Sequence, residues 1–226
     1  MSVTEDLTVR GLVLLCGRGA PVSGELDGFE VRTVAERPGK ADVDPHLGDV
    51  DRLVVAGTDA ALASVVVRLL RKDALSRVAV GFVPAAADSA VAAVWGLPTG
   101  AAEALKVAVH GDPDPVPLIR DDSGGVLVGR ATVGPVRGVA YCDDEVALRG
   151  AARQIAVTPD PDGGTGLVAR VTKGLVFKRP STTRGRAFQI GCVPTVPVLD
   201  GVPFPRQISK WTWYRHTEDL RLARAR

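Results

Sequence analysis

Short apolar runs alternate with helical segments through residues 1–111, and this alternation limits the fold more than any other feature. Residues 11–16 (GLVLLC) form a continuous apolar run, which is typical of a strand buried in a parallel sheet. Beyond residue 58, apolar side chains recur at helical spacing. The pattern predicts strands at 11–16, 29–34, 52–56 and 77–83, and helices beginning near residues 59, 88 and 99. Residues 1–111 are therefore expected to form a doubly wound α/β domain.

The pattern changes after Gly111, where short β-type runs separated by Gly, Asp and Pro replace the helices. They predict antiparallel hairpins in a β-sandwich or open barrel over residues 112–205. The runs lie at 126–128, 136–141, 154–157, 167–171, 175–178, 187–192 and 196–199. The last segment, 206–226, is expected to return to the first domain. It carries Trp211 and Trp213 on one face of a strand, so we expect these two side chains to pack in a core between the two halves. The Arg-rich tail after it is expected to be frayed.

The cysteines and the apolar runs restrict the cellular setting. Cys16, Cys142 and Cys192 lie far apart and form no CxxC pair, which argues against a disulfide framework and a zinc site. No apolar window approaches the ~18 residues of a membrane span, and the first apolar run is too short for a signal peptide. A reducing cytoplasm fits these features.

The net charge of +2 hides an asymmetry between the two parts of the chain. Residues 1–150 carry 15 basic and 21 acidic side chains, and residues 151–226 carry 13 and 5. A basic second half is compatible with contact to a lipid or membrane surface, although a solvated face explains it equally well. The basic side chains considered are Lys173, Lys178, Arg179, Arg184 and Arg186. They are dispersed and form no known reader motif, so nucleic acid is an unlikely partner.

Two junctions between a strand and a helix combine small and acidic residues. Residues 54–61 (VVAGTDAA) end a predicted strand and open a helix. Residues 81–90 (GFVPAAADSA) precede a short helix that ends at Gly96-Leu97-Pro98. Helix N-termini with small residues can hold phosphates, because free N–H groups point outward and the helix dipole favours anions.

In this order and spacing, the two junctions resemble the catalytic region of the diacylglycerol kinase and lipid kinase family, which shares its fold with the NAD kinases. That family has a Val-Val-Ala-Gly-Gly-Asp-Gly-Thr loop, then a Pro-Leu-Gly-Thr-Ala-Asn-Asp loop and, after a short helix, Gly-Leu-Pro. Asp200-Gly201 stands where members often carry Asp-Gly-Glu. The resemblance covers residues 50–110 well, 184–215 loosely and 112–183 poorly. It implies a Rossmann-like α/β domain followed by a mainly antiparallel β-sandwich-like domain.

The resemblance also implies roles for particular residues. They are Asp59 and Asp200 as catalytic groups, and Gly17, Arg18, Gly19, Gly57, Thr58, Asp88 and Ser89 as nucleotide or phosphate ligands, with no metal site assigned. Simpler interpretations stay open for three of them. Asp59 could be a plain helix N-cap, Arg18 part of a strand-end turn, and Asp200 part of a hairpin turn.

The departures from the family pattern bear on activity. Thr58 and Ala60 replace glycines of the first loop, Ala87 and Ala90 replace Thr and Asp of the second, and Val202 replaces the late Glu. Phosphoryl transfer needs positioned charge, carboxylates that hold a metal, and a group that orients the nucleophile. The resemblance thus implies a degenerate lipid kinase with weak or no ATP- and Mg²⁺-dependent transfer to a lipid hydroxyl. The alternatives are an active lipid kinase with altered loops and a non-enzymatic scaffold or homo-oligomerisation module.

Overall fold

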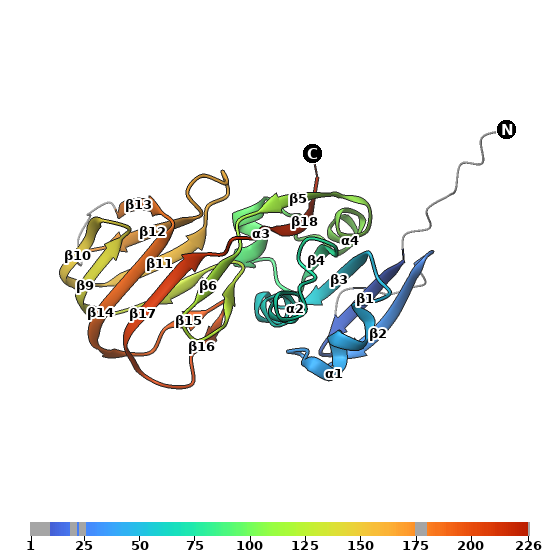
Figure 1. Ribbon diagram of the computed structural model, residues 1–226, viewed down its shortest axis with the longest axis horizontal. Helices are drawn as coiled ribbons and strands as arrows, with labels where there is room; N and C mark the ends of the chain where they lie inside the picture. Colours follow the sequence, from blue (N-terminus) through green and yellow to red (C-terminus); the bar gives the residue numbers. More distant parts are fainter. Residues whose placement is uncertain (1–9, 19–21, 23–25, 175–179, 226) are drawn as a thin grey trace.

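Sheet A organises the first half of the protein in the computed structural model, which describes residues 10–18, 22, 26–174 and 180–225 (Figure 1). Its strands are, in spatial order, β2 (Phe29–Val34), β1 (Gly11–Cys16), β3 (Arg52–Gly57), β4 (Ala79–Pro84), β18 (Leu220–Arg224) and β5 (Asp112–Val116). The first five run parallel, and β5 pairs antiparallel with β18. β4 is buried along its whole length, as expected for a central parallel strand.

Helices cover both faces of sheet A. They are α1 (Lys40–Val43), the 3-10 helix η1 (Asp44–His46), α2 (Asp59–Arg71), α3 (Ala90–Trp95) and α4 (Ala101–His110). α2 buries Leu62, Val66 and Leu69 in the core on one face of the sheet, and α4 buries Ala108 on the other face. A Cβ at Gly81 would lie 2.3 Å from the carbonyl oxygen of Ala108, so a glycine in β4 permits the close approach of α4.

The second half is a sandwich of two six-stranded sheets. Sheet B contains β10 (Glu145–Ala152), β9 (Val136–Cys142), β14 (Ala187–Thr195), β17 (Ile208–Arg215), β6 (Ile119–Asp121) and β7 (Val126–Leu127). Sheet C contains β13 (Ser181–Gly185), β12 (Leu167–Thr172), β11 (Gln154–Pro159), β8 (Ala131–Val133), β15 (Val198–Leu199) and β16 (Val202–Pro203). The pairings are antiparallel, which confirms the predicted α/β domain followed by an antiparallel β-sandwich.

Some sequence predictions were wrong in detail. Trp211 and Trp213 do not pack between the halves; they lie in the core of the sandwich itself. The tail is not frayed at residues 220–224, since Leu222 is fully buried in β18. The strand expected at 175–178 lies outside the described residues. Thr58 caps α2, in agreement with a helix beginning near residue 59. Ser89 caps α3 and Gly100 precedes α4, so these two helices begin one residue later than expected.

The chain crosses between the two halves twice. It leaves sheet A after β5, forms the sandwich, and returns from β17 to β18 (Figure 1). The backbone N–H of His216 donates to the carbonyl of Leu118 at 2.8 Å, so the two crossings are hydrogen-bonded to each other. No helix in the described part of the chain is long and apolar enough to cross a membrane.

Candidate functional site

Asp59 connects the beginnings of two helices. The Thr58 hydroxyl caps α2 by accepting from the backbone N–H of Ala61 at 3.2 Å, which leaves the Asp59 carboxylate free to reach α3. One of its oxygens accepts from the Ser89 hydroxyl at 2.5 Å, and the other accepts from the backbone N–H of Ala90 at 2.7 Å. A carboxylate at a helix N-terminus satisfies free N–H groups and interacts favourably with the helix dipole. Asp59 is therefore engaged in holding α3 in place.

The loop before α3 is also tied to β3. The backbone N–H of Ala85 donates to the carbonyl of Gly57 at 2.8 Å. A Cβ at Gly57 would lie 2.8 Å from the Cβ of Cys16 in β1, so this junction needs a glycine. Burial raises the pKa of the Cys16 thiol to about 12, which keeps it protonated and unreactive.

Asp200 is a buried carboxylate at the turn between β15 and β16. It is 4% exposed and its backbone has φ +46. Its side chain accepts from the backbone N–H groups of Val128, Gly129 and Arg130 at 3.1, 2.8 and 3.0 Å. Burial raises the pKa of Asp200 to about 7, with a smaller contribution from the charge of Asp59, while the three N–H donors oppose the rise.

The structure brings six of the sequence-predicted residues to one cavity of about 230 Å³, which we call the strand-end pocket. It is lined by Gly57, Thr58, Asp59, Asp88, Ser89 and Asp200. Gly17 and Arg18 follow β1 but do not line this pocket, and Gly19 lies outside the described residues. Among the described residues that line the pocket, Arg130 is the one cation, beside three carboxylates.

This lining bears on phosphate binding. The strand-end pocket carries more negative than positive charge, which opposes a phosphate unless a cation accompanies it. Within the described ranges, no group of three or more His, Cys, Asp or Glu side chains is arranged to hold a metal ion. Ala90, which stands in place of the family's Asp, lines the pocket with a methyl group. The pocket therefore offers a phosphate few partners of its own.

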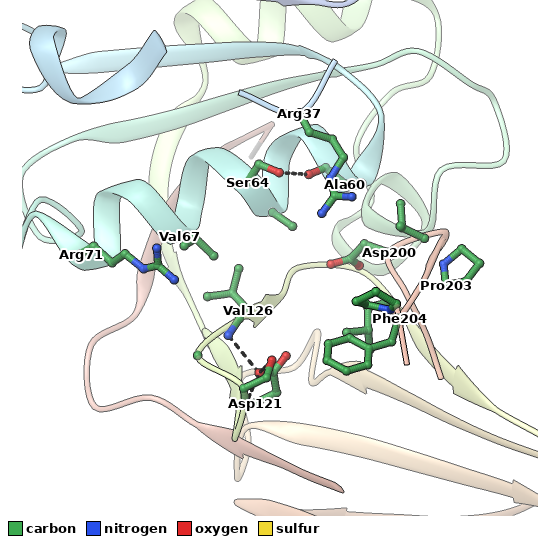
Figure 2. Close-up of a pocket in the computed structure, with 17 residues that line it drawn as sticks. Arg37, Ala60, Ser64, Val67, Arg71, Asp121, Val126, Asp200, Pro203 and Phe204 are labelled. Carbon is green, nitrogen blue, oxygen red and sulfur yellow. Dashed lines mark hydrogen bonds between the residues drawn. The ribbon is translucent and has the colours of Figure 1, made fainter. Parts of the chain in front are cut away.

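A larger cavity of about 430 Å³, the hairpin pocket, lies between α2 and the β15–β16 hairpin (Figure 2). One wall is a stripe of α2 that consists of Ala60, Ala63, Ser64, Val67 and Arg71. The opposite wall contains Val202, Pro203 and Phe204, and Arg37 comes from the segment after β2. Asp200 lines both cavities. Asp121, at the end of β6, lines this pocket as well. The pocket thus combines an apolar surface with two arginines and two carboxylates, a mixed lining that suits an amphipathic ligand.

Sequence reasoning missed most of the hairpin pocket. One signal was present in α2, because residues 60, 63, 64, 67 and 71 recur at helical spacing on the side opposite the buried Leu62, Val66 and Leu69. The side chains on this stripe are small apart from Arg71. A stripe of small residues beside a predicted strand-to-helix junction could have indicated a cavity there.

The basic residues considered in the second half lie in different surroundings where the structure describes them. Arg184 donates to Asp160 at 2.9 Å and to Asp162 at 3.1 Å, so its charge is paired within the sandwich. Lys173 and Arg186 are exposed, and Lys178 and Arg179 lie outside the described residues. Arg184 therefore stabilises the turn between β11 and β12.

Replacing Asp59 with alanine should destabilise the protein by about 1–3 kcal/mol, because the Ser89 hydroxyl and the Ala90 N–H lose their acceptor. Urea unfolding followed by circular dichroism measures the loss. Asp49→Ala is the control, since Asp49 is exposed in the turn before β3. If both variants unfold at the same urea concentration, Asp59 does not hold α3.

No protein-family model and no curated protein sequence matches the chain, but solved structures match nearly its whole length. A diacylglycerol kinase from Bacillus anthracis str. Sterne aligns with a TM-score of 0.66 at 13% identity, over 95% of this chain and 97% of that one. An NAD kinase from Archaeoglobus fulgidus in complex with ATP aligns with a TM-score of 0.60 at 10% identity, over 95% and 93%. This chain has the diacylglycerol kinase and NAD kinase fold.

A yeast NADH kinase complexed with NADH has the same architecture, with a TM-score of 0.53 at 11% identity over 96% of this chain and 84% of that one. Identities this low show the fold and not the reaction. In this diacylglycerol kinase fold, the two cavities meet at Asp200, which is supplied by the sandwich, beside α2, which is supplied by the α/β half.

Proposed function

We propose that this protein is a degenerate lipid kinase that keeps a ligand site between its halves and transfers phosphoryl groups weakly or not at all. The observation that carries the proposal is the engagement of Asp59. Both of its carboxylate oxygens already accept hydrogen bonds from the N-terminal end of α3. A group that takes a proton from a substrate hydroxyl needs an oxygen within hydrogen-bond reach of it. In this arrangement, the Asp59 carboxylate holds α3 in place.

The surroundings of Asp59 support the same proposal. Ala90 and Val202 are apolar where the family has carboxylates, so the chain has lost groups that would hold Mg²⁺ or position a phosphate. The hairpin pocket nevertheless remains open, with Arg37 and Arg71 beside an apolar wall. We take ATP as the first candidate ligand and Mg²⁺ as its companion, because the carboxylates of the strand-end pocket would repel an unaccompanied triphosphate. Free cysteines at 16, 142 and 192 support a cytoplasmic location.

A thermal-shift titration with ATP tests the ligand site. Occupancy at ~100 times Kd adds about 2.7 kcal/mol of stability, which corresponds to roughly 5–10 °C for a chain of this size. We expect such a shift with Mg²⁺ and a smaller one without it. Ala63→Trp, which fills the hairpin pocket from α2, should abolish the shift. Lys106→Trp, on the exposed side of α4, should leave it unchanged.

A phosphoryl-transfer assay separates the degenerate kinase from an active one. Labelled ATP, Mg²⁺ and diacylglycerol in mixed micelles should give little or no product. Turnover of about 1 s⁻¹ or more, as kinases commonly show, that falls ~100-fold or more in Asp59→Asn would establish an active lipid kinase and reject the proposal. If millimolar ATP gives no thermal shift, the proposal no longer includes a nucleotide ligand, and a non-enzymatic scaffold is favoured.

A further inference from the structure

β2 forms the outer edge of sheet A. It pairs with β1 on one side, and no described strand pairs with its other side (Figure 1). The four central residues of this strand are exposed. A strand edge of this kind presents a row of unpaired N–H and C=O groups, which can pair with another strand. The edge of β2 is therefore available to pair with another strand, and its sequence limits the register of that pairing.

The backbone of β2 fixes which residues can pair outward. The Gly28 carbonyl accepts from the N–H of Gly11, and the Val34 carbonyl accepts from the N–H of Gly17, both at 3.1 Å. Residues with even numbers therefore direct their backbone groups toward β1. Because successive residues of a strand point these groups to opposite sides, Phe29, Val31 and Thr33 direct theirs outward.

The side chains of β2 add a charge pattern. Glu30 and Arg32 lie on one face of the strand, where they form an ion pair at 2.6 Å. Val31 lies on the opposite face and is 38% exposed, which is unusual for a large apolar side chain of this protein. The strand is thus acidic before Val31 and basic after it, a sequence that complements itself when it is reversed.

We propose that two copies of this chain associate through antiparallel pairing of β2 with β2, centred on Val31. With the two-fold axis at Val31, outward-directed residues of the two strands pair with each other. Glu30 then lies opposite Arg32 of the partner subunit on both sides of the axis. Centres at Glu30 or Arg32 would place like charges opposite each other. Centres at Phe29 or Thr33 would leave half of the strand unpaired. The dimer joins the two copies of sheet A into one continuous sheet.

The contact is small, so the dimer should be weak. Stable interfaces bury about 1,200–2,000 Å², more than a six-residue strand pair provides. We therefore expect a dissociation constant in the micromolar range. Sedimentation equilibrium of the full chain, up to roughly millimolar protein, measures it. A chain that is monomeric throughout this range would overturn the proposal.

Charge reversal tests the contact. Arg32→Glu places carboxylates opposite each other at two positions, and it should weaken the dimer roughly 10- to 100-fold. The double variant Glu30→Arg with Arg32→Glu restores opposite charges and should recover the wild-type constant. Both residues are exposed, so the thermal unfolding of the dilute monomer should change little. If Arg32→Glu leaves the dimer intact, or if the double variant does not recover it, the two copies associate through another surface.

Cysteine cross-linking tests the register. At the two-fold axis, hydrogen-bonded partners in an antiparallel pair lie about 5.5 Å apart between Cα atoms, which is within disulfide range. Under mild oxidation, Val31→Cys should form a disulfide-linked dimer that the wild type does not form. Thr33→Cys is the matched control, since its copies would lie about 13 Å apart. Equal cross-linking of the two variants would overturn the register.

Discussion

Asp200→Ala should lower the free energy of unfolding by about 3 kcal/mol or more above neutral pH. Three backbone N–H groups, from Val128, Gly129 and Arg130, lose their acceptor at once, and each unsatisfied buried donor costs about 1–3 kcal/mol. Urea unfolding measures the loss. Asp144→Ala, at an exposed position in the β9–β10 turn, should change the free energy of unfolding by less than about 0.5 kcal/mol.

The pH dependence of stability gives a second measurement on the same residue. Burial raises the pKa of Asp200 from 3.8 to about 7. Between these values the folded protein holds a proton that the unfolded chain has released, so the free energy of unfolding falls as the pH rises. The slope from this group is roughly 1.4 kcal/mol per pH unit at most, and it vanishes above pH 7. Asp200→Asn should lack this part of the slope. A variant with the same slope as the wild type would show that Asp200 stays ionised.

Trp213→Ala should destabilise the protein by about 3–5 kcal/mol, because the indole is 0% exposed and its removal leaves a cavity in the sandwich core. The ring lies 6.2 Å from that of Phe188 and 6.1 Å from that of Trp211, measured between centroids, so three large side chains share this core. Circular dichroism in urea measures the loss. Thr212→Ala, on the other face of β17, is the matched control.

Trp213→Phe separates packing from hydrogen bonding. The Trp213 Nε1 is buried and has no hydrogen-bond partner in the described part of the chain. Phenylalanine removes this unpaired donor and keeps most of the apolar volume, so it should cost clearly less than alanine. Equal losses in the alanine and phenylalanine variants would mean that the core cannot repack around the smaller ring.

The sequence was sufficient for the elements that local patterns specify. Four of the five parallel strands of sheet A, namely β1, β2, β3 and β4, were predicted from local patterns. The convergence of Asp59 and Ser89 agrees with two loops that were singled out together. β18 was missed because the arginines of its Leu-Arg-Leu-Ala-Arg sequence indicated a frayed tail, whereas its burial comes from pairing with β4 and β5. Such long-range pairing leaves no local signal.

The candidate site was predictable only in part, for a related reason. The strand-end pocket mostly collects residues next to each other in two loops, with Arg130, Asp200 and Gly201 as the exceptions. The hairpin pocket depends on how the β15–β16 hairpin of the sandwich meets α2, a contact between segments more than a hundred residues apart. The burial of Trp211 inside the sandwich likewise depends on Phe204, whose ring meets it edge-on at 4.6 Å.

The place of β18 in sheet A has a consequence for how the protein is made. β18 lies between β4 and β5 and pairs with both, so the edge formed by β4 stays open while the whole sandwich is being synthesised. The half of the protein that leaves the ribosome first is therefore the half that is finished last. An open, apolar parallel edge invites wrong partners during that interval. Stop codons a few residues before the end should thus harm solubility far more than their distance from both cavities suggests.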